Sequence, residues 1–153
     1  MYIKNKNRGL TFIEVMATVA IISILAAGIL PLSRMMYKRK NELKLRRNLR
    51  IIRTALDQYK KSVDMGNIQR DTESGYPKTL AVLVRGADIN GIVNQKKKFL
   101  RKLPRDPMTK DGRWGLKSYA DEPDSTIWGG QDVYDVYSKS NARAIDGTFY
   151  GEW

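Results

Sequence analysis

The stretch LTFIEVMATVAIISILAAGILPL, residues 10–32, decides the fold of this 153-residue chain. It holds 23 residues and a single charge, the carboxylate of Glu14. An α-helix rises about 1.5 Å per residue, so a helix of this length spans roughly 35 Å and reaches across the hydrocarbon core of a bilayer. The stretch therefore predicts an apolar helix that is long enough to cross a membrane.

Two simple interpretations of residues 1–33 each leave something unexplained. A secretory signal peptide has an apolar core of about 7–15 residues and then a small-residue cleavage site. Here the apolar core is longer, and no such site follows it. A plain membrane anchor explains the length but leaves Glu14 in hydrocarbon, at a cost of about 2.5–3.5 kcal/mol. The next basic residue downstream is Arg34, about five helical turns away, so Glu14 needs a partner from outside its own helix.

Residues 8–14, RGLTFIE, follow a short basic leader and resemble the N-terminal signature of type IV pilins and of the pseudopilins of type II secretion. The resemblance implies that a prepilin peptidase cuts after Gly9 and that the new terminal amine of Leu10 is methylated. Phe usually follows the cut in this family, and Leu10 keeps the apolar character. The resemblance also implies that Glu14 pairs with the terminal amine of a neighbouring subunit, and that Pro31 marks a defect in the long helix.

Residues 34–65 predict an amphipathic continuation of the helix. Apolar side chains recur at steps of three and four, which is one face of an α-helix. The members of this stripe are Leu45, Leu49, Ile52, Leu56, Tyr59 and Val63. No Pro or Gly interrupts residues 32–65, and Gly66-Asn67 predicts the end of the helix. We expect the rest of the chain to cover the stripe.

The net charge of +12 is distributed unevenly along the chain. Residues 34–61 contain eleven Lys and Arg against two acidic residues, whereas residues 106–153 contain nine acidic residues against five basic ones. We expect the basic helix face to be solvated or to meet acidic neighbours in a filament, and DNA or acidic lipid is the less favoured alternative. The positive-inside rule alone places the part after the apolar stretch in the cytoplasm. The pilin resemblance places it outside, and we follow the resemblance.

Residues 66–153 predict a small loop-rich domain with a short antiparallel sheet. Gly, Pro, Asn and Asp mark many turns, and the candidate strands are residues 116–119 and 133–137, with a weaker one at 148–150. A helical turn is expected at residues 80–84. The aromatic residues are expected in the core and on the sheet: Trp114, Trp128, Trp153, Tyr119, Tyr134 and Tyr137.

The expected fold class is α+β, with a long N-terminal α-helix packed on a small antiparallel sheet, as in type IV pilins. The expected organisation has four parts. These are a prepilin leader at 1–9, a hydrophobic transmembrane or filament-core helix at 10–33, an amphipathic helix at 34–65, and the loop-rich domain at 66–153.

Three further segments resemble the major, G-type pseudopilin of type II secretion systems. They are YPKT at 76–79 followed by LV at 83–84, FLRKLPRDP at 99–107 and YDVYS at 134–138. The resemblance implies a structural subunit of the periplasmic secretion filament, not an enzyme. Before assembly the chain would cross the bacterial inner membrane once, with its C-terminal domain in the periplasm. The expected partners are further copies of the chain, the prepilin peptidase, the secretion assembly platform and minor pseudopilins.

Other functions stay open beside this one. The nearest alternative is a type IV pilin or minor pilin for adhesion, motility or DNA uptake. A membrane-tethered nucleic-acid-binding module is a remote alternative, and we do not expect nucleic acid as a partner. The chain has no His and no Cys, which excludes His general bases, Cys nucleophiles and zinc fingers.

Calcium is the only cofactor that the family resemblance suggests. The family binds it in a C-terminal loop, and here the corresponding residues 139–147 offer one carboxylate, Asp146, together with an Arg. Calcium usually takes six to eight oxygen ligands. Asp146 is therefore the candidate metal ligand, and Asp146-Gly147 is equally a hairpin turn.

Overall fold

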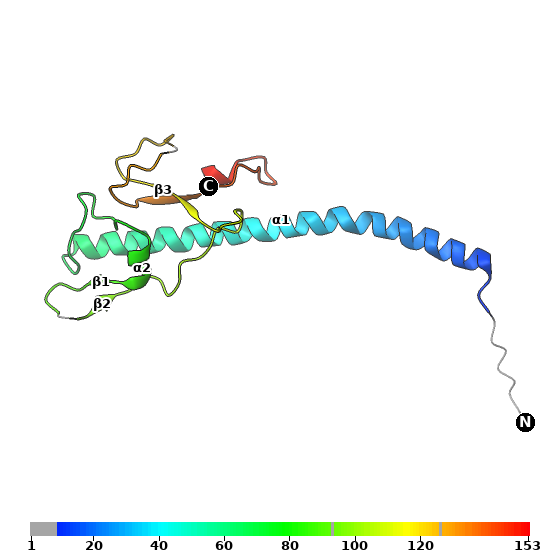
Figure 1. The fold of residues 1–153 in the computed structure, drawn as a ribbon, viewed down its shortest axis with the longest axis horizontal. Coiled ribbons are helices and arrows are strands. Elements are labelled where there is room, and N and C mark those ends of the chain that lie inside the picture. The colour runs from blue at the N-terminus through cyan, green and yellow to red at the C-terminus, as the bar shows by residue number, and fades with distance from the viewer. Residues whose placement is uncertain (1–8, 93, 126) are drawn as a thin grey trace, which may run out of the picture. The chain divides into compact units, whose positions relative to one another are not determined.

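The computed structural model describes residues 9–92, 94–125 and 127–153, and gives only the backbone of residues 28, 30 and 31. The chain divides into two compact units, Met1–Arg39 and Lys40–Trp153, and the long helix contributes residues to both. The elements in Figure 1 are α1 (Phe12–Asp64), α2 (Ala81–Arg85), β1 (Ala87–Asp88), β2 (Lys96–Lys97), β3 (Trp114–Lys117), β4 (Asp135–Ser138) and the short 3₁₀ helix η1 (Tyr150–Glu152). This architecture confirms the predicted α+β class.

In the first unit, α1 begins at Phe12, directly after Thr11. The backbone N–H groups of Glu14 and Val15 donate to the carbonyl oxygen of Thr11 at 3.1 and 3.2 Å and so close the first turn. The 18-residue stretch of highest hydropathy in α1 averages 2.4, and none of it is buried. By length and composition, α1 can therefore cross a membrane.

In the second unit, the predicted stripe of α1 is the centre of the hydrophobic core. All six of its members are buried: Leu45, Leu49, Ile52, Leu56, Tyr59 and Val63. Their cover comes from α2, β3, β4 and the segment before η1, through Leu83, Trp114, Val136 and Ala144. Burying a side chain of this size contributes about 1.5–3 kcal/mol, so the stripe is the main reason that this part of α1 packs on the sheet.

The end of α1 follows from a single glycine. Gly66 has a φ of 72°, in the left-handed region that favours Gly. The N–H of Gly66 donates to the oxygen of Val63 and the N–H of Asn67 to that of Ser62, both at 2.9 Å. This pattern is a Schellman cap, which satisfies carbonyl groups left open at a helix end. The helix end predicted at Gly66-Asn67 is confirmed.

Two small antiparallel sheets complete the second unit. β3 pairs with β4, with Trp114 opposite Ser138 and Lys117 opposite Asp135. These strands correspond to the predicted strands 116–119 and 133–137. β1 pairs with β2 in a short hairpin that the sequence did not predict as strands.

The third predicted strand, 148–150, is wrong. Phe149 makes only an isolated bridge to Arg143, and the chain then enters η1. The physical reason is a tight turn on each side: Ala144 N donates to Thr148 O at 2.8 Å, and Glu152 N donates to Phe149 O at 3.1 Å. The segment between these turns is too short to pair as a strand.

Candidate functional site

The predicted cleavage position lies just ahead of α1. Gly9 and Leu10 precede the helix, are outside regular secondary structure and are exposed. A Cβ atom added at Gly9 would meet no atom within 4 Å. The bond between the two residues is therefore accessible to a peptidase. Cleavage after Gly9 and methylation of Leu10 stay predictions.

Glu14 lies in the first turn of α1, where the helix dipole stabilises a negative charge. Among the described residues, its carboxylate makes no hydrogen bond and no ion pair, and most of the side chains around it on the helix are exposed and apolar. A carboxylate in such surroundings gains most from a cation supplied by another molecule. The pairing predicted for Glu14 needs a second copy, so the single chain does not test it.

The helix defect predicted at Pro31 also stays a prediction. The helical assignment of α1 runs through residue 31, although the side chain of Pro31 lies outside the described residues. A proline still removes one backbone donor from the ladder. The backbone is therefore helical at residue 31, and the helix lacks one backbone hydrogen bond there.

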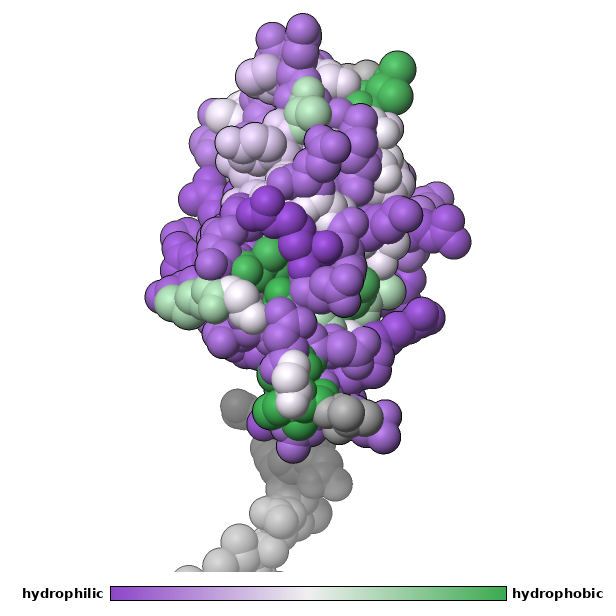
Figure 2. Space-filling view, turned by 90° about the vertical axis from the view of Figure 1, so that its left-hand side faces the viewer, coloured by the Kyte–Doolittle hydropathy of each residue, from purple (hydrophilic) through white to green (hydrophobic). Residues whose placement is uncertain are grey.

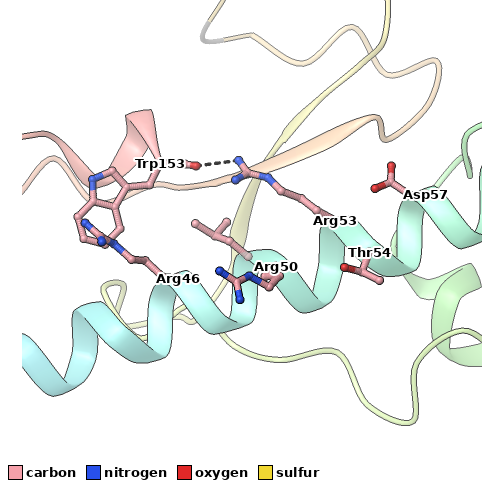
Figure 3. Close-up of a pocket in the computed structure, with 7 residues that line it drawn as sticks. Arg46, Arg50, Arg53, Thr54, Asp57 and Trp153 are labelled. Atoms are coloured by element: carbon pink, nitrogen blue, oxygen red, sulfur yellow. Dashed lines mark hydrogen bonds between the residues drawn. The ribbon is translucent and has the colours of Figure 1, made fainter.

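The second unit holds the C-terminal segment against α1 through arginines. The lining of a hollow of about 500 Å³ includes Arg46, Arg50, Arg53 and Trp153. Figure 3 shows these side chains as sticks. The guanidinium of Arg46 lies over the indole of Trp153, 4.2 Å from the ring centroid. Arg53 donates to the carbonyl oxygen of Trp153 at 2.7 Å. Two of the three arginines thus fix the last described residue on the helix.

Arg53 also ties β4 to the helix. Its Nε and Nη2 donate to the two carboxylate oxygens of Asp135 at 2.7 and 3.1 Å. Its Nη2 further contacts the carbonyl oxygen of Val136 at 3.3 Å. Such a two-pronged contact is directional and stronger than a single ion pair. Part of the predicted basic face therefore meets the acidic C-terminal region within one chain.

Glu42 is a second anchor, which the sequence did not reveal. Its Oε1 accepts hydrogen bonds from the Tyr150 hydroxyl and from the Ile145 N–H, both at 2.8 Å. Burial and the neighbouring Glu42 carboxylate raise the pKa of Tyr150 to about 12. The partners of Glu42 lie more than 100 residues away in the chain, so no local pattern points to them.

The carboxylate of Asp146, the candidate calcium ligand, already has partners within the chain. Its Oδ1 accepts from the Thr148 N–H and hydroxyl, at 3.1 and 2.6 Å, and its Oδ2 lies 3.3 Å from Arg46. The hydrogen bonds from Thr148 lower the pKa of Asp146. The described residues hold no group of three or more His, Cys, Asp or Glu suited to a metal. A guanidinium therefore lies beside the only carboxylate of this loop, and calcium binding stays an untested prediction.

The aromatic residues were predicted in the core and on the sheet, which is right for Trp114 and wrong for Tyr119 and Trp128, because both are exposed in the loop between β3 and β4. Trp114 is buried, whereas Tyr119 is 64% and Tyr134 is 45% exposed. Tyr76 joins them, with ring centroids 6.2 Å from Tyr119 and 5.1 Å from Tyr134. The loop between β3 and β4 carries Tyr119 away from the core because the Asp132 carboxylate holds its backbone, accepting from Tyr119 N at 2.9 Å.

Comparison with known proteins recognises the same N-terminal segment. Residues 4–30 match the family model of the prokaryotic N-terminal methylation motif. No curated protein and no solved structure gives a significant match to the chain. The apolar helix and the motif are consistent with membrane anchoring before assembly. The match covers residues 4–30 alone and supports the pilin and pseudopilin family.

Proposed function

We propose that the chain is the major subunit of the periplasmic filament of a type II secretion system. The observation that carries the proposal is the methylation motif at residues 4–30, which includes the start of α1, where the described apolar side chains are exposed. The segments at 76–84, 99–107 and 134–138, which resemble the G-type pseudopilin, favour secretion over a pilus.

The exposed apolar part of α1 has two roles, one in the membrane and one in the filament. Before assembly it crosses the inner membrane and leaves the second unit in the periplasm. After the peptidase has cut behind Gly9 and Leu10 is methylated, copies leave the membrane and these helices pack into a filament core. A helix that is apolar all round is stable in lipid or inside a bundle, and not in water.

Glu14 and the amine of Leu10 set the register between copies. Opposite charges attract strongly in a low-dielectric interior, and each relieves the desolvation of the other. A pair formed only at the correct axial offset favours one helical arrangement over its neighbours. The assembly platform and minor pseudopilins start the filament, and the second units form its outer surface.

Deletion of the gene tests the role in secretion. We expect folded cargo proteins to accumulate in the periplasm, and a plasmid copy to restore their release. The measurement is the amount of cargo in periplasmic and culture fractions. Normal secretion together with a loss of surface fibres, twitching or DNA uptake would reject the secretion role in favour of a type IV pilin.

The orientation has its own test, which the absence of Cys makes simple. Glu122 is exposed and makes no ion pair among the described residues, so Glu122→Cys introduces one reactive thiol in the second unit. We expect a membrane-impermeant thiol reagent to label this variant in cells whose outer membrane has been opened. Labelling only after the inner membrane is broken would place the second unit in the cytoplasm, as the positive-inside rule suggests.

A further inference from the structure

The arginines of α1 in the second unit fall into two groups. Arg46 and Arg53 are engaged with Trp153 and Asp135. Arg47 and Arg50 are exposed and make no hydrogen bond or ion pair among the described residues. At about 100° per residue, these two lie on the side of α1 opposite to the buried stripe. We call Arg47 and Arg50 the free arginine pair.

A surface of opposite character lies on the loops. Tyr76, Tyr119 and Tyr134 form the aromatic cluster described above, and Tyr119 also borders a hollow of about 740 Å³. The exposed carboxylates of Asp71 and Glu73 line the same hollow, with Lys78 as the one cation among its lining residues. We call the three tyrosines with these two carboxylates the tyrosine–carboxylate surface.

The carboxylates of this surface lack internal partners. Within the part of the chain that the structure describes, Asp71 and Glu73 make no hydrogen bond and no ion pair. Asp132, which also lines the hollow, is in contrast buried and accepts from Ser74 and Ser118 at 2.5 and 2.9 Å. The lining of the hollow thus combines one buried, hydrogen-bonded carboxylate with two exposed carboxylates that have no partner among the described residues.

A guanidinium fits such a surface chemically. It stacks on aromatic faces and donates to carboxylates through a planar fork. The chain makes both contacts internally, through Arg46 over Trp153 and Arg53 on Asp135. The free arginine pair could make both kinds of contact. The tyrosine–carboxylate surface offers the aromatic rings and the carboxylates that these contacts need.

One face of the second unit carries no large apolar patch. Figure 2 looks on to the end of the second unit, where most of the surface is hydrophilic and hydrophobic side chains occur in small separate groups. An association of second units through the face in Figure 2 therefore depends more on polar contacts than on a large apolar patch.

We propose that the tyrosine–carboxylate surface of one copy receives the free arginine pair of a neighbouring copy. The inference rests on the proposed self-assembly and adds the residues through which the second units meet. Because the two surfaces are different, the contact is heterologous, and such contacts repeat into an open helical array unless the rotation closes a ring. The partner is thus a second copy of this chain.

Charge reversal in the full chain tests the proposal in cells that contain the assembly machinery. We expect Arg47→Glu with Arg50→Glu, and separately Asp71→Lys with Glu73→Lys, to lower filament yield at least tenfold. The fourfold variant restores opposite charges across the interface, and we expect its yield to return to within about threefold of the original chain. Arg101→Glu with Lys102→Glu is the matched control, because both residues are exposed and unpaired among the described residues.

A cross-linking experiment keeps the test independent of yield. The chain has no Cys, so Arg50→Cys combined with Glu73→Cys forms disulfides only at the introduced positions. We expect a ladder of multimers in assembled filaments, and none when either substitution is made alone. Normal filaments without a ladder, and normal yield in both reversal variants, would each overturn the proposed contact.

The outcomes also separate this inference from the proposed function. If the original chain is cut and forms filaments while the reversal variants do so equally well, the contact is wrong and the subunit role stands. If the original chain stays uncut and single, the subunit role itself fails. If reversal of the arginine pair leaves filaments intact but abolishes salt-dependent DNA binding, the basic face serves nucleic acid and the contact is wrong.

Discussion

The same helix meets two different requirements in its two parts. In the second unit, α1 carries a narrow apolar stripe, and the loops and sheet of that unit cover it. In the first unit, the described apolar side chains of α1 are exposed on all sides. The second unit thus buries its apolar stripe with its own residues. The apolar surface of the first unit, in contrast, needs lipid or other copies of the chain to cover it.

The carboxylates of the two parts show the same contrast. Glu42, in the second unit, accepts two hydrogen bonds at 2.8 Å from distant parts of the chain. Glu14, in the first unit, has no hydrogen-bond or ion-pair partner among the described residues. The Glu42 carboxylate holds the fold together, and we propose that the Glu14 carboxylate serves assembly. Four predictions break or sharpen this comparison.

Gly9→Val should have the largest effect, a complete loss of processing and of filaments. A Cβ at this position meets no atom within 4 Å, so the change alters the peptidase site and not the fold. Ser33→Val adds a branched side chain at another exposed position of the first unit and should be processed normally. Intact mass and sedimentation of filaments check both. Processed Gly9→Val protein would contradict the assigned cleavage position.

Leu56→Ala and Leu25→Ala make the same change in the two parts of α1. Leu56 is 0% and Leu25 is 62% exposed. We expect Leu56→Ala to lower the free energy of unfolding of the second unit by about 2–5 kcal/mol, because it leaves a cavity. Leu25→Ala should change it by less than about 0.5 kcal/mol. Denaturant unfolding of the full chain in detergent measures both, and equal effects would remove the distinction between the parts.

Glu14→Ala should leave membrane insertion and cleavage intact but lower filament yield about tenfold. The reason is that the terminal amine of a neighbour then enters the filament core without a counter-charge. Thr18→Ala is the control, because the Thr18 hydroxyl already donates to Val15 O at 2.9 Å within the helix. Filament pelleting with intact mass checks the prediction. Filaments of normal yield from Glu14→Ala would reject the charge pairing.

Tyr150→Phe should have the smallest effect, about 1 kcal/mol of unfolding free energy, since Glu42 keeps the Ile145 N–H as a donor. The pKa of Tyr150 is raised from 10.0 to about 12. The stability it contributes is therefore full below pH 10 and is lost as the pH rises through 12. The unfolding free energies of the original chain and of Tyr150→Phe, measured in urea, should therefore become more similar as the pH rises from 10 to 12. A difference that stays constant up to pH 12 would contradict the Glu42 contact.

The sequence predicted the elements that depend on local pattern. The steps of three and four gave the buried stripe, and Gly66-Asn67 gave the end of α1, since periodicity and a left-handed glycine act over a few residues. The domain boundaries stay a prediction, and the compact units in the structure meet between Arg39 and Lys40.

The contacts that were missed depend on long-range packing. Arg53 meets Asp135 across 82 positions, and nothing near Arg53 distinguishes it from Arg50, which stays unpaired in the described chain. The exposed position of Tyr119 depends likewise on its backbone contact with Asp132. At the candidate site, the roles of Gly9, Leu10 and Glu14 stay predictions, which rest on the resemblance of residues 8–14 to the pilin signature.

The central claim is that the first unit is processed and then held by lipid or by other copies. The most direct measurement is the mass and N-terminal sequence of the chain from the native membrane fraction. The account predicts a chain that begins at Leu10 and is heavier by one methyl group. An uncut chain that begins at Met1 would contradict it, and would make the protein a tethered domain whose basic helix face needs another explanation.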